Sequence, residues 1–382
     1  MRKSILRFAS VIFGIALTPL PGNAANMLVF FGTHRSGPSL GFSLAHFNPI
    51  TGALSQPEFL QEAEAPAFFV IHPDGKHLYT CNSMDSYQGK PGGAVSAYTI
   101  EPKTGNLALL NRKPTGGGEP SYISLDHTGR YALVANYNGG SVCVYAIQPD
   151  GGFGERTAFI QHTGSSTHPQ RQKHAYAHSI IVDPGNRFAL AADLGADKVF
   201  VYRFNAKDGS LVPNDPPSVS LKPGSGPRHI KFHPNGKFVY AINELSSTVT
   251  GFNWNSLTGS LTEFQSLSTL PADFNGFNTC AEIEVHPNGK FLYGTNRGHD
   301  SIAVFGIDAV TGRLTPVEHV PTRGKMPRNF AFDPTGKWIL LSNHDSNNSV
   351  VFRVDDRTGM LTQTGKPVEV PDPFCERFLP LP

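Results

Sequence analysis

A turn flanked by two short strands with alternating apolar residues recurs along the chain, and this repeat constrains the fold more than any other feature. The turns carry Pro-x-Gly or a close variant, typical of tight reversals between strands. The six copies are HPDGKHLYTCN (72–82), DHTGRYALVAN (126–136), DPGNRFALAAD (183–193), HPNGKFVYAIN (233–243), HPNGKFLYGTN (286–296) and DPTGKWILLSN (333–343). A period of roughly fifty residues is typical of propeller blades.

A second signature lies between these copies and completes the repeating unit. TGAL, TGNL, DGSL, TGSL, TGRL and TGML begin at positions 51, 104, 208, 258, 311 and 358, and a weaker DGGF begins at 150. Each unit therefore predicts four antiparallel strands: two around the first turn, a third such as 141–147, and a fourth after the TGxL turn. Radial repetition of such units makes a β-propeller. A long β-sandwich would not explain one register kept through six copies.

The two ends of the chain supply the missing parts of a further unit. MLVFFGTH (27–34) resembles a second strand with no first strand before it, and PDPFCERF (371–378) resembles a first strand with nothing after it. Pairing these segments closes the ring and removes free sheet edges. We therefore predict an all-β, seven-bladed β-propeller of four-stranded antiparallel blades over residues 26–382.

The first 25 residues predict a signal peptide. They contain basic residues near the start, an apolar run at 8–17, prolines at 19 and 21, and small residues at 22–25. The alternative is an uncleaved anchor, although the run is short for a membrane span. We expect an exported protein, periplasmic or secreted, that is free of the membrane after cleavage and monomeric.

The net charge limits the classes of partner, and the cysteines indicate neither a zinc site nor a need for disulfides. The formal net charge is only +2, so nothing in the sequence calls for nucleic acid or an acidic membrane surface as partner. Four cysteines are present at spacings that fit no zinc motif. In a chain of this size we expect them to be buried free thiols, although an exported protein permits disulfides.

Polar residues flank the repeated hairpin at the end away from its turn. In the stretch 226–245 these are Arg228, His229 and Glu244. Every hairpin points the same way in a propeller, so the equivalent positions of all blades converge on one face around the axis. The charged and imidazole residues expected on this rim are His178, Arg228, His229, Glu244, Glu282, Arg297, Arg328 and His344.

This rim suits an anionic small molecule and acid–base chemistry. Arginine binds carboxylate or phosphate with two parallel hydrogen bonds, and histidine exchanges protons near neutral pH. The alternative is structural: Arg228 and Glu244 could form an ion pair that closes their own hairpin. The histidines of the HPxG turns, His72, His233 and His286, lie at the opposite end and are expected to serve the turns.

The same stretches carry a resemblance to a known family. GPRHIKFHPNGKFVYAINEL (226–245), CAEIEVHPNGKFLYGTNRGHDSIAVF (280–305), RQKHAYAHSIIVDPGNRFALAADLGADKVFVYRF (171–204) and MPRNFAFDPTGK (326–337) resemble the seven-bladed lactonases. That family includes propeller-type 6-phosphogluconolactonases and fungal carboxy-cis,cis-muconate cyclases, and the likeness covers nearly all of the chain after residue 25. It implies a propeller without metal or other cofactor, with its site at one end of the central channel.

The resemblance also implies roles for particular residues. Residues proposed as catalytic in the muconate cyclases fall on His178, Arg228, Glu244 and Arg297, which leaves His229, Glu282, Arg328 and His344 as substrate-binding candidates. The sequence departs from the family where a second histidine often precedes His178, because Tyr176 occupies that position and His174 is out of register. Which histidine acts is therefore open.

Three functions follow from these observations. The first is a hydrolase that opens a sugar-derived lactone, with His178 or Glu244 as base and Arg228 or Arg297 stabilising negative charge. Its substrate would resemble 6-phosphogluconolactone or, given the export signal, an unphosphorylated aldonolactone. The second is a cycloisomerase acting on a muconate-type dicarboxylate, and the third is a propeller that binds without catalysis. The resemblance favours the first.

Overall fold

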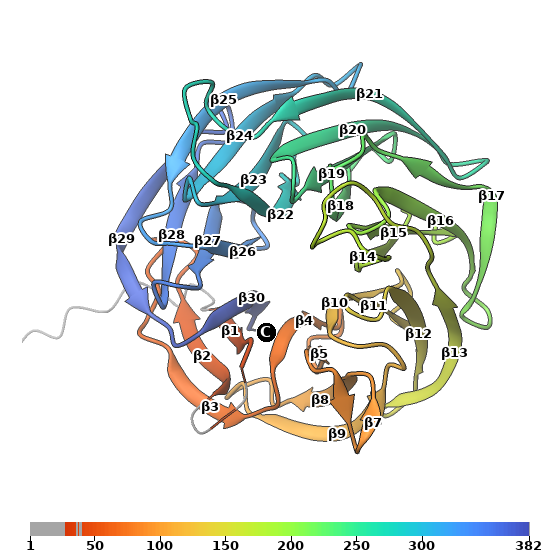
Figure 1. Ribbon diagram of the computed structural model, residues 1–382. Helices are drawn as coiled ribbons and strands as arrows, with labels where there is room; N and C mark the ends of the chain where they lie inside the picture. Colours follow the sequence, from red (N-terminus) through yellow and green to blue (C-terminus); the bar gives the residue numbers. More distant parts are fainter. Residues whose placement is uncertain (1–26, 36, 38–39, 382) are drawn as a thin grey trace, which may run out of the picture.

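The computed structural model describes residues 27–35, 37 and 40–381, so the predicted signal peptide lies outside the described residues. These residues form seven four-stranded antiparallel sheets arranged radially around a common axis (Figure 1). This confirms the predicted seven-bladed propeller. No helix among the described residues has the length and apolar character that a membrane span requires.

Each blade contributes one strand to each of four concentric positions. The innermost strands are β4 (Pro66–Ile71), β10 (Pro120–Leu125), β14 (Ala177–Val182), β18 (Pro227–Phe232), β22 (Thr279–Val285), β26 (Pro327–Phe332) and β30 (Pro373–Pro380). The second strands are β5 (His77–Asn82), β11 (Tyr131–Asn136), β15 (Phe188–Asp193), β19 (Phe238–Asn243), β23 (Phe291–Arg297), β27 (Trp338–Asn343) and β1 (Met27–Thr33).

The outer half of each blade is built in the same way. The third strands are β8 (Ala94–Ile100), β12 (Ser141–Ile147), β16 (Lys198–Asn205), β20 (Thr248–Asn255), β24 (Ser301–Ile307), β28 (Asn348–Val354) and β2 (Gly41–Phe47). The outermost strands are β9 (Leu107–Pro114), β13 (Phe153–Gln161), β17 (Ser210–Ser220), β21 (Ser260–Ser268), β25 (Leu314–Pro321), β29 (Leu361–Glu369) and β3 (Glu58–Glu62). A small hairpin, β6 (Ser86–Tyr87) with β7 (Lys90–Pro91), is inserted after β5.

The core lies between the faces of neighbouring blades. Second strands such as β11, β15, β19 and β27 are buried at every position, because a blade packs against each of their faces. Outermost strands such as β13 are largely exposed or half-buried. Runs of apolar residues therefore mark the second strands, while polar residues gather in the outermost ones.

The chain ends close the ring as predicted. Strand β1 pairs antiparallel with β30, from Met27 opposite Pro380 to Gly32 opposite Cys375. The terminal blade therefore has the order β3-β2-β1-β30, with its innermost strand supplied by the C-terminal end of the chain. Both edges of β1 are hydrogen-bonded, which protects a strand that is otherwise apolar and open to association.

A β-bulge interrupts the start of the innermost strands, and the sequence pattern did not predict it. In β18, Pro227 is opposite Asn243 but His229 is opposite Ile242, so Arg228 is an extra residue. Bulges redirect side chains, and they are common beside active sites. The residues at the equivalent shifts are Ala67, Ser121, His178, Arg228, Arg328 and, in the terminal blade, Phe374.

The histidines of the HPxG turns hold neighbouring blades together at the opposite end. The Nε2 of His233 donates to the carbonyl of Gly289 at 2.7 Å, and the Nε2 of His286 donates to that of Gly336 at 2.8 Å. His72 makes the same contact with Gly129 at 3.1 Å. The Nδ1 atom of each of these histidines also accepts the backbone N–H of the residue two positions later, which is the role in the turn that the sequence predicted. The four cysteines are buried free thiols, as expected.

Candidate active site

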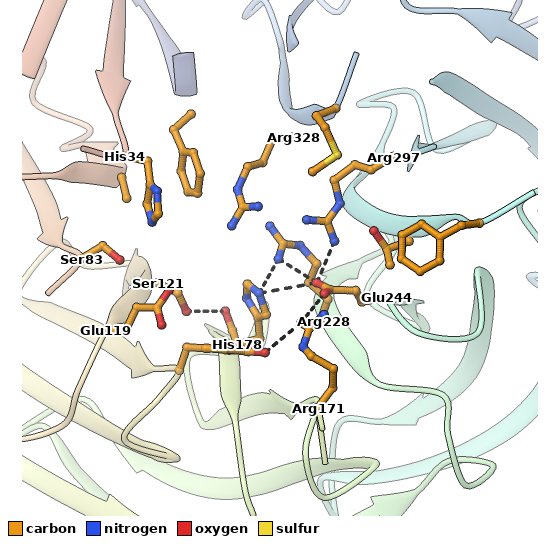
Figure 2. Close-up of a pocket in the computed structure, with 16 residues that line it drawn as sticks. His34, Ser83, Glu119, Ser121, Arg171, His178, Arg228, Glu244, Arg297 and Arg328 are labelled. Carbon is orange, nitrogen blue, oxygen red and sulfur yellow. Dashed lines mark hydrogen bonds and ion pairs between the residues drawn. The ribbon is translucent and has the colours of Figure 1, made fainter. Parts of the chain in front are cut away.

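A pocket of about 420 Å³ lies at the end of the axis that faces away from the HPxG turns, a volume suited to a small molecule. Its walls come from the starts of innermost strands, the ends of second strands and two loops (Figure 2). The lining residues are His34, Ala67, Ser83, Glu119, Ser121, Tyr137, Arg171, His178, Arg228, Glu244, Phe277, Thr279, Arg297, Met326, Arg328 and Phe374. The four residues predicted as catalytic therefore share one pocket.

Glu244 is buried beneath three arginines. Its Oε2 accepts a hydrogen bond from Arg228 at 3.0 Å and forms an ion pair with Arg297 at 2.9 Å, and its Oε1 accepts a hydrogen bond from Arg171 at 2.6 Å (Figure 2). Burial alone would raise the pKa of Glu244, but the arginines hold that pKa well below its ordinary value. A carboxylate so strongly stabilised is a poor proton acceptor, and it instead fixes the arginines in position.

His178 is buried beside this cluster and is bonded to it through one ring nitrogen. Its Nε2 contacts Nη1 of Arg228, and its Nδ1 has no partner among the described residues. Burial, followed by the charge of Arg228, holds the pKa of His178 well below its ordinary value. Because a guanidinium can only donate, Nε2 is the acceptor and the neutral ring carries its proton on Nδ1.

Arg328 lies near the other arginines of the pocket, and burial, followed by the charges of Arg228 and Arg297, holds its pKa well below the ordinary value. Unlike the other three arginines, it forms no ion pair within the described part of the chain. Its guanidinium lies 3.9 Å from the ring centroid of Phe374, and its Nε is buried without a hydrogen-bond partner. A guanidinium held in this way is suited to an anionic group of a bound ligand.

His229 and Glu282 lie deeper along the axis and do not line the main pocket. The Nδ1 of His229 is 2.8 Å from Oε1 of Glu282, and the side-chain amide of Asn329 donates to Oε2 of the same carboxylate. All three side chains are almost completely buried. These residues therefore form a polar layer beneath the arginines.

His344 lies outside the pocket lining. Its ring contacts Asp372 through Nε2 at 3.1 Å and Asp345 through Nδ1 at 2.8 Å. Asp372 also accepts hydrogen bonds from the backbone of His34 and Arg35. The structure therefore does not bring His344 together with the other seven predicted site residues, and instead pairs it with a loop of the terminal blade.

Arg171 is a pocket residue that could not be predicted from the repeat. It lies in the long loop between β13 and β14, and its Nη2 reaches both Tyr137 Oη at 2.9 Å and Glu244. The strand register assigns no position to a loop residue. The available signals were the length of this loop and its place just before His178 in a segment that resembles the family. Glu119 and Phe277, also on the lining, likewise come from outside the repeated positions.

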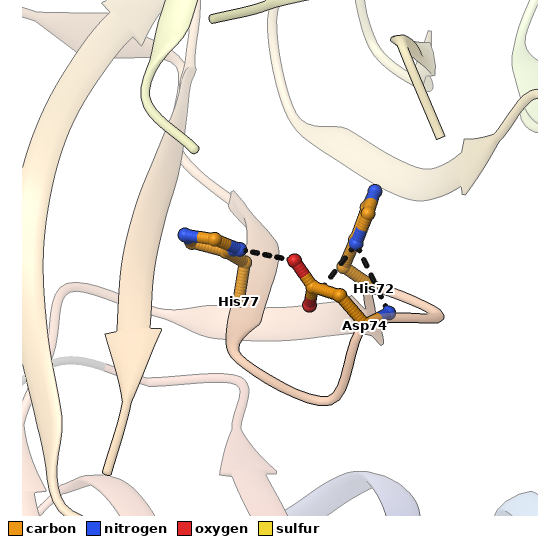
Figure 3. A group of neighbouring side chains, drawn as sticks. All are labelled: His72, Asp74 and His77. Carbon is orange, nitrogen blue, oxygen red and sulfur yellow. Dashed lines mark hydrogen bonds and ion pairs between the residues drawn. The ribbon is translucent and has the colours of Figure 1, made fainter. Parts of the chain in front are cut away.

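One group of side chains among the described residues is close enough to share a metal ion, and it lies far from the pocket. His72, Asp74 and His77 surround the first HPxG turn (Figure 3). Their atoms already serve that turn: Nδ1 of His72 accepts the backbone N–H of Asp74, and Asp74 pairs with His77 at 2.8 Å. In the pocket, the oxygens of Glu244 are occupied by arginines, so the donor set there suits an anion rather than a cation.

Comparison with known proteins agrees with this geometry. Residues 28–378 match the family model described as "Lactonase, 7-bladed beta-propeller". A 6-phosphogluconolactonase of Bacillus subtilis is 36% identical over 350 residues, covering 92% of this chain and 97% of that protein. One of Formosa agariphila is 35% identical, covering 78% and 84%. The solved structure of a periplasmic gluconolactonase of Pseudomonas aeruginosa superposes with a TM-score of 0.87 at 34% identity, covering 94% and 100%.

Proposed function

The chain belongs to the seven-bladed β-propeller lactonase family, and on that premise we propose that it hydrolyses a sugar-derived lactone in the pocket around Glu244. The observation that carries the proposal is the set of four arginines, of which three are fixed by one buried carboxylate and one has no carboxylate partner. Hydrolysis of a lactone passes through a tetrahedral oxyanion, and fixed cationic donors lower the energy of that state.

Each part of the pocket has a proposed task. Arg228 and Arg297 stabilise the negative charge that develops on the carbonyl oxygen, because Glu244 holds both guanidinium groups in place before the substrate arrives. His178, protonated on Nδ1, adds a neutral hydrogen-bond donor. Arg328 binds a polar or anionic group elsewhere on the substrate. None of these tasks requires a metal or another cofactor, so we propose a metal-independent reaction.

The substrate that we propose is an aldonolactone, which could be phosphorylated or unphosphorylated. The relatives named above include 6-phosphogluconolactonases, and one structural neighbour is named a periplasmic gluconolactonase. The N-terminal 25 residues predict export to the periplasm or beyond, where phosphorylated sugars are scarce. We therefore propose an unphosphorylated aldonolactone as the substrate. We also propose that the protein is a monomer.

The experiment is a rate measurement on purified protein against a panel of lactones. Opening of gluconolactone and 6-phosphogluconolactone is followed by acid release at constant pH, after subtraction of the spontaneous rate. A carboxy-muconate is included, since the same arginines could clamp a dicarboxylate for cycloisomerisation. We expect acceleration of lactone opening, larger for the unphosphorylated lactone. Folded protein that accelerates no lactone would refute the proposal.

Export is tested separately. When the complete sequence is expressed, we expect the protein to be recovered from the periplasm or the medium. Its N-terminus should then lie near residue 25. Full-length protein retained in the cytoplasm would contradict the predicted signal peptide. Gel filtration of the mature chain tests the proposed monomer.

A further inference from the structure

A second, much smaller cavity adjoins the pocket. Its volume is about 10 Å³, close to the space that one water molecule needs. It shares five lining residues with the pocket and adds Phe68, His229 and Asn329 from the deeper layer. The shared residues are Ser121, His178, Arg228, Arg328 and Phe374. The cavity therefore connects the buried dyad of His229 and Glu282 with the arginine pocket.

Three buried polar atoms belong to residues that line this cavity and have no hydrogen-bond partner among the described residues. They are Nδ1 of His178, Nε2 of His229 and Nε of Arg328. Buried polar groups are rarely left without a partner, and a water held inside a protein forms two to four hydrogen bonds. Three such atoms on residues that line a water-sized cavity are candidate partners for one bound water molecule.

The hydrogen bonds of the two histidines give their free nitrogens opposite characters. Oε1 of Glu282 accepts from Nδ1 of His229 at 2.8 Å and from the backbone N–H of Ile283 at 3.1 Å, so His229 carries its proton on Nδ1. Its Nε2 is then a lone-pair acceptor. In His178 the bond from Arg228 fixes the reverse tautomer, and its free Nδ1 is a donor.

We propose that His229 is the general base of the lactone hydrolysis, acting on a water molecule held in this cavity, and that Glu282 is the residue that positions it. The proposal rests on the proposed function. It replaces His178 and Glu244, the bases considered from the sequence, with a dyad whose acceptor nitrogen is free. His178 would donate a hydrogen bond to the water while His229 accepts its proton, which leaves the second lone pair of the water oxygen for the lactone carbonyl carbon.

The reaction balances without any further reactant. Water loses a proton to Nε2 of His229 as its oxygen bonds to the lactone carbonyl carbon, and the carbonyl π electrons move to an oxygen stabilised by the arginines. When the carbonyl re-forms, the ring C–O bond breaks, and the leaving oxygen takes the proton from the His229 imidazolium. The product is a hydroxy acid, which ionises at neutral pH.

The surroundings of His229 favour its neutral form. Burial, followed by the charges of Arg228 and Lys231, lowers the pKa of His229 well below its ordinary value. The charged groups that act on it from its own and neighbouring strands are Arg228, Lys231, Glu244, Glu282 and Arg328, while His178 and Tyr122 face it as neutral rings. At neutral pH the ring is therefore uncharged and its Nε2 lone pair is free, although the lowered pKa makes it a weaker base than an ordinary histidine.

The test is the pH dependence of kcat/KM for wild type and for His229→Gln. In the wild type we expect the rate to rise with pH through a midpoint below the ordinary histidine value of about 6.5 and then to level off. In His229→Gln we expect a loss of about 10²–10⁴-fold, with the acid limb gone and the remaining rate increasing with hydroxide concentration. A folded variant with the wild-type rate and pH profile would overturn the proposal.

Two further variants separate a base from a structural residue. Glu282→Gln removes the carboxylate that sets the tautomer of His229, and we expect a loss on the order of 100-fold in kcat, a displaced acid limb and little change in KM. His286→Gln removes another buried histidine, one that serves a turn at the opposite end, so it should lower stability and leave the pH profile unchanged. A Glu282→Gln profile identical to that of the wild type would also overturn the proposal.

The outcomes also separate this proposal from the proposed function. A wild type that opens no lactone refutes both. A wild type that opens lactones, together with a folded His229→Gln that retains rate and profile, leaves the function standing and refutes only the assignment of the base. If in that case His178→Asn abolishes the acid limb, His178 is the base.

Discussion

Replacing Arg228 by alanine removes a side chain that joins three parts of the site. Its Nη1 donates to Oε2 of Glu244 at 3.0 Å and contacts Nε2 of His178, while its Nε donates to the carbonyl of Ala281 at 3.1 Å. Burial lowers the pKa of Arg228 to about 10, so it is charged at neutral pH. The substitution therefore removes one buried positive charge and at least three hydrogen bonds.

The structure gives a magnitude for each effect. Removing one partner of a buried ion pair costs about 3–5 kcal/mol of stability. The cost here should lie near the lower value, about 3 kcal/mol, because Arg171 and Arg297 still hold Glu244. Loss of one donor to a developing oxyanion lowers kcat by about 10²–10³-fold. Arg228→Lys keeps the charge but cannot reproduce the fork of the guanidinium, so it should recover only part of the rate.

The assay combines turnover of the best lactone with unfolding by denaturant. The matched control is Arg203→Ala, which removes an exposed arginine from β16 and should change neither quantity. A folded Arg228→Ala variant with unchanged kcat would remove Arg228 from the catalytic site. An unchanged free energy of unfolding would show that the buried network does not stabilise the blade.

Four further outcomes are expected. Deletion of residues 371–382 removes β30 and exposes an edge of β1, so the protein should aggregate; a soluble monomer of unchanged thermal stability would contradict ring closure. The pKa of Glu244 is held below its unfolded value of about 4.3, so the stability that this carboxylate contributes is present above that pH and lost as pH falls below it. Glu244→Gln should flatten the decline in unfolding free energy below about pH 4. An unaltered decline would contradict the pairing of Glu244 with three arginines. Burial raises the pKa of Glu376 to about 8, so the free energy of unfolding should fall as pH rises from about 4.3 toward 8. Glu376→Gln should lessen this fall by up to about 1.4 kcal/mol per pH unit. Equal slopes of unfolding free energy against pH for the two proteins would count against a buried, protonated carboxyl. Exhaustive chelation should leave lactone opening unchanged, and a loss that calcium restores would refute a metal-independent site.

Much of the fold could be predicted from the sequence because its determinants are local. Turn residues such as Gly236, which has a φ of 69°, and alternation around them mark each hairpin within about a dozen residues. Repetition of that signal gave the number of blades. The incomplete units at the two ends indicated that β1 and β30 would pair.

The sequence also identified much of the rim. Because hairpins of one register place equivalent positions at one end, Arg228, Glu244, His178 and Arg297 could be grouped before any distance was known. The structure brings these four into one pocket. His344 occupies the equivalent position in its own blade but does not line this pocket. Its side chain instead pairs with Asp372, which immediately precedes β30 of the terminal blade.

Only the tertiary structure decided how the polar groups share their hydrogen bonds. The bulge in β18 brings Arg228 and His229 to adjoining cavities, although strict alternation would place neighbours on opposite faces. Arg171 comes from a loop that no repeat indexes, and it takes the second oxygen of Glu244. Which nitrogen of each histidine remains free depends on partners about fifty residues away in the chain. The physical reason is range: turns and alternation act between near neighbours, whereas pairing, burial and tautomer depend on distances that exist only after the blades have packed.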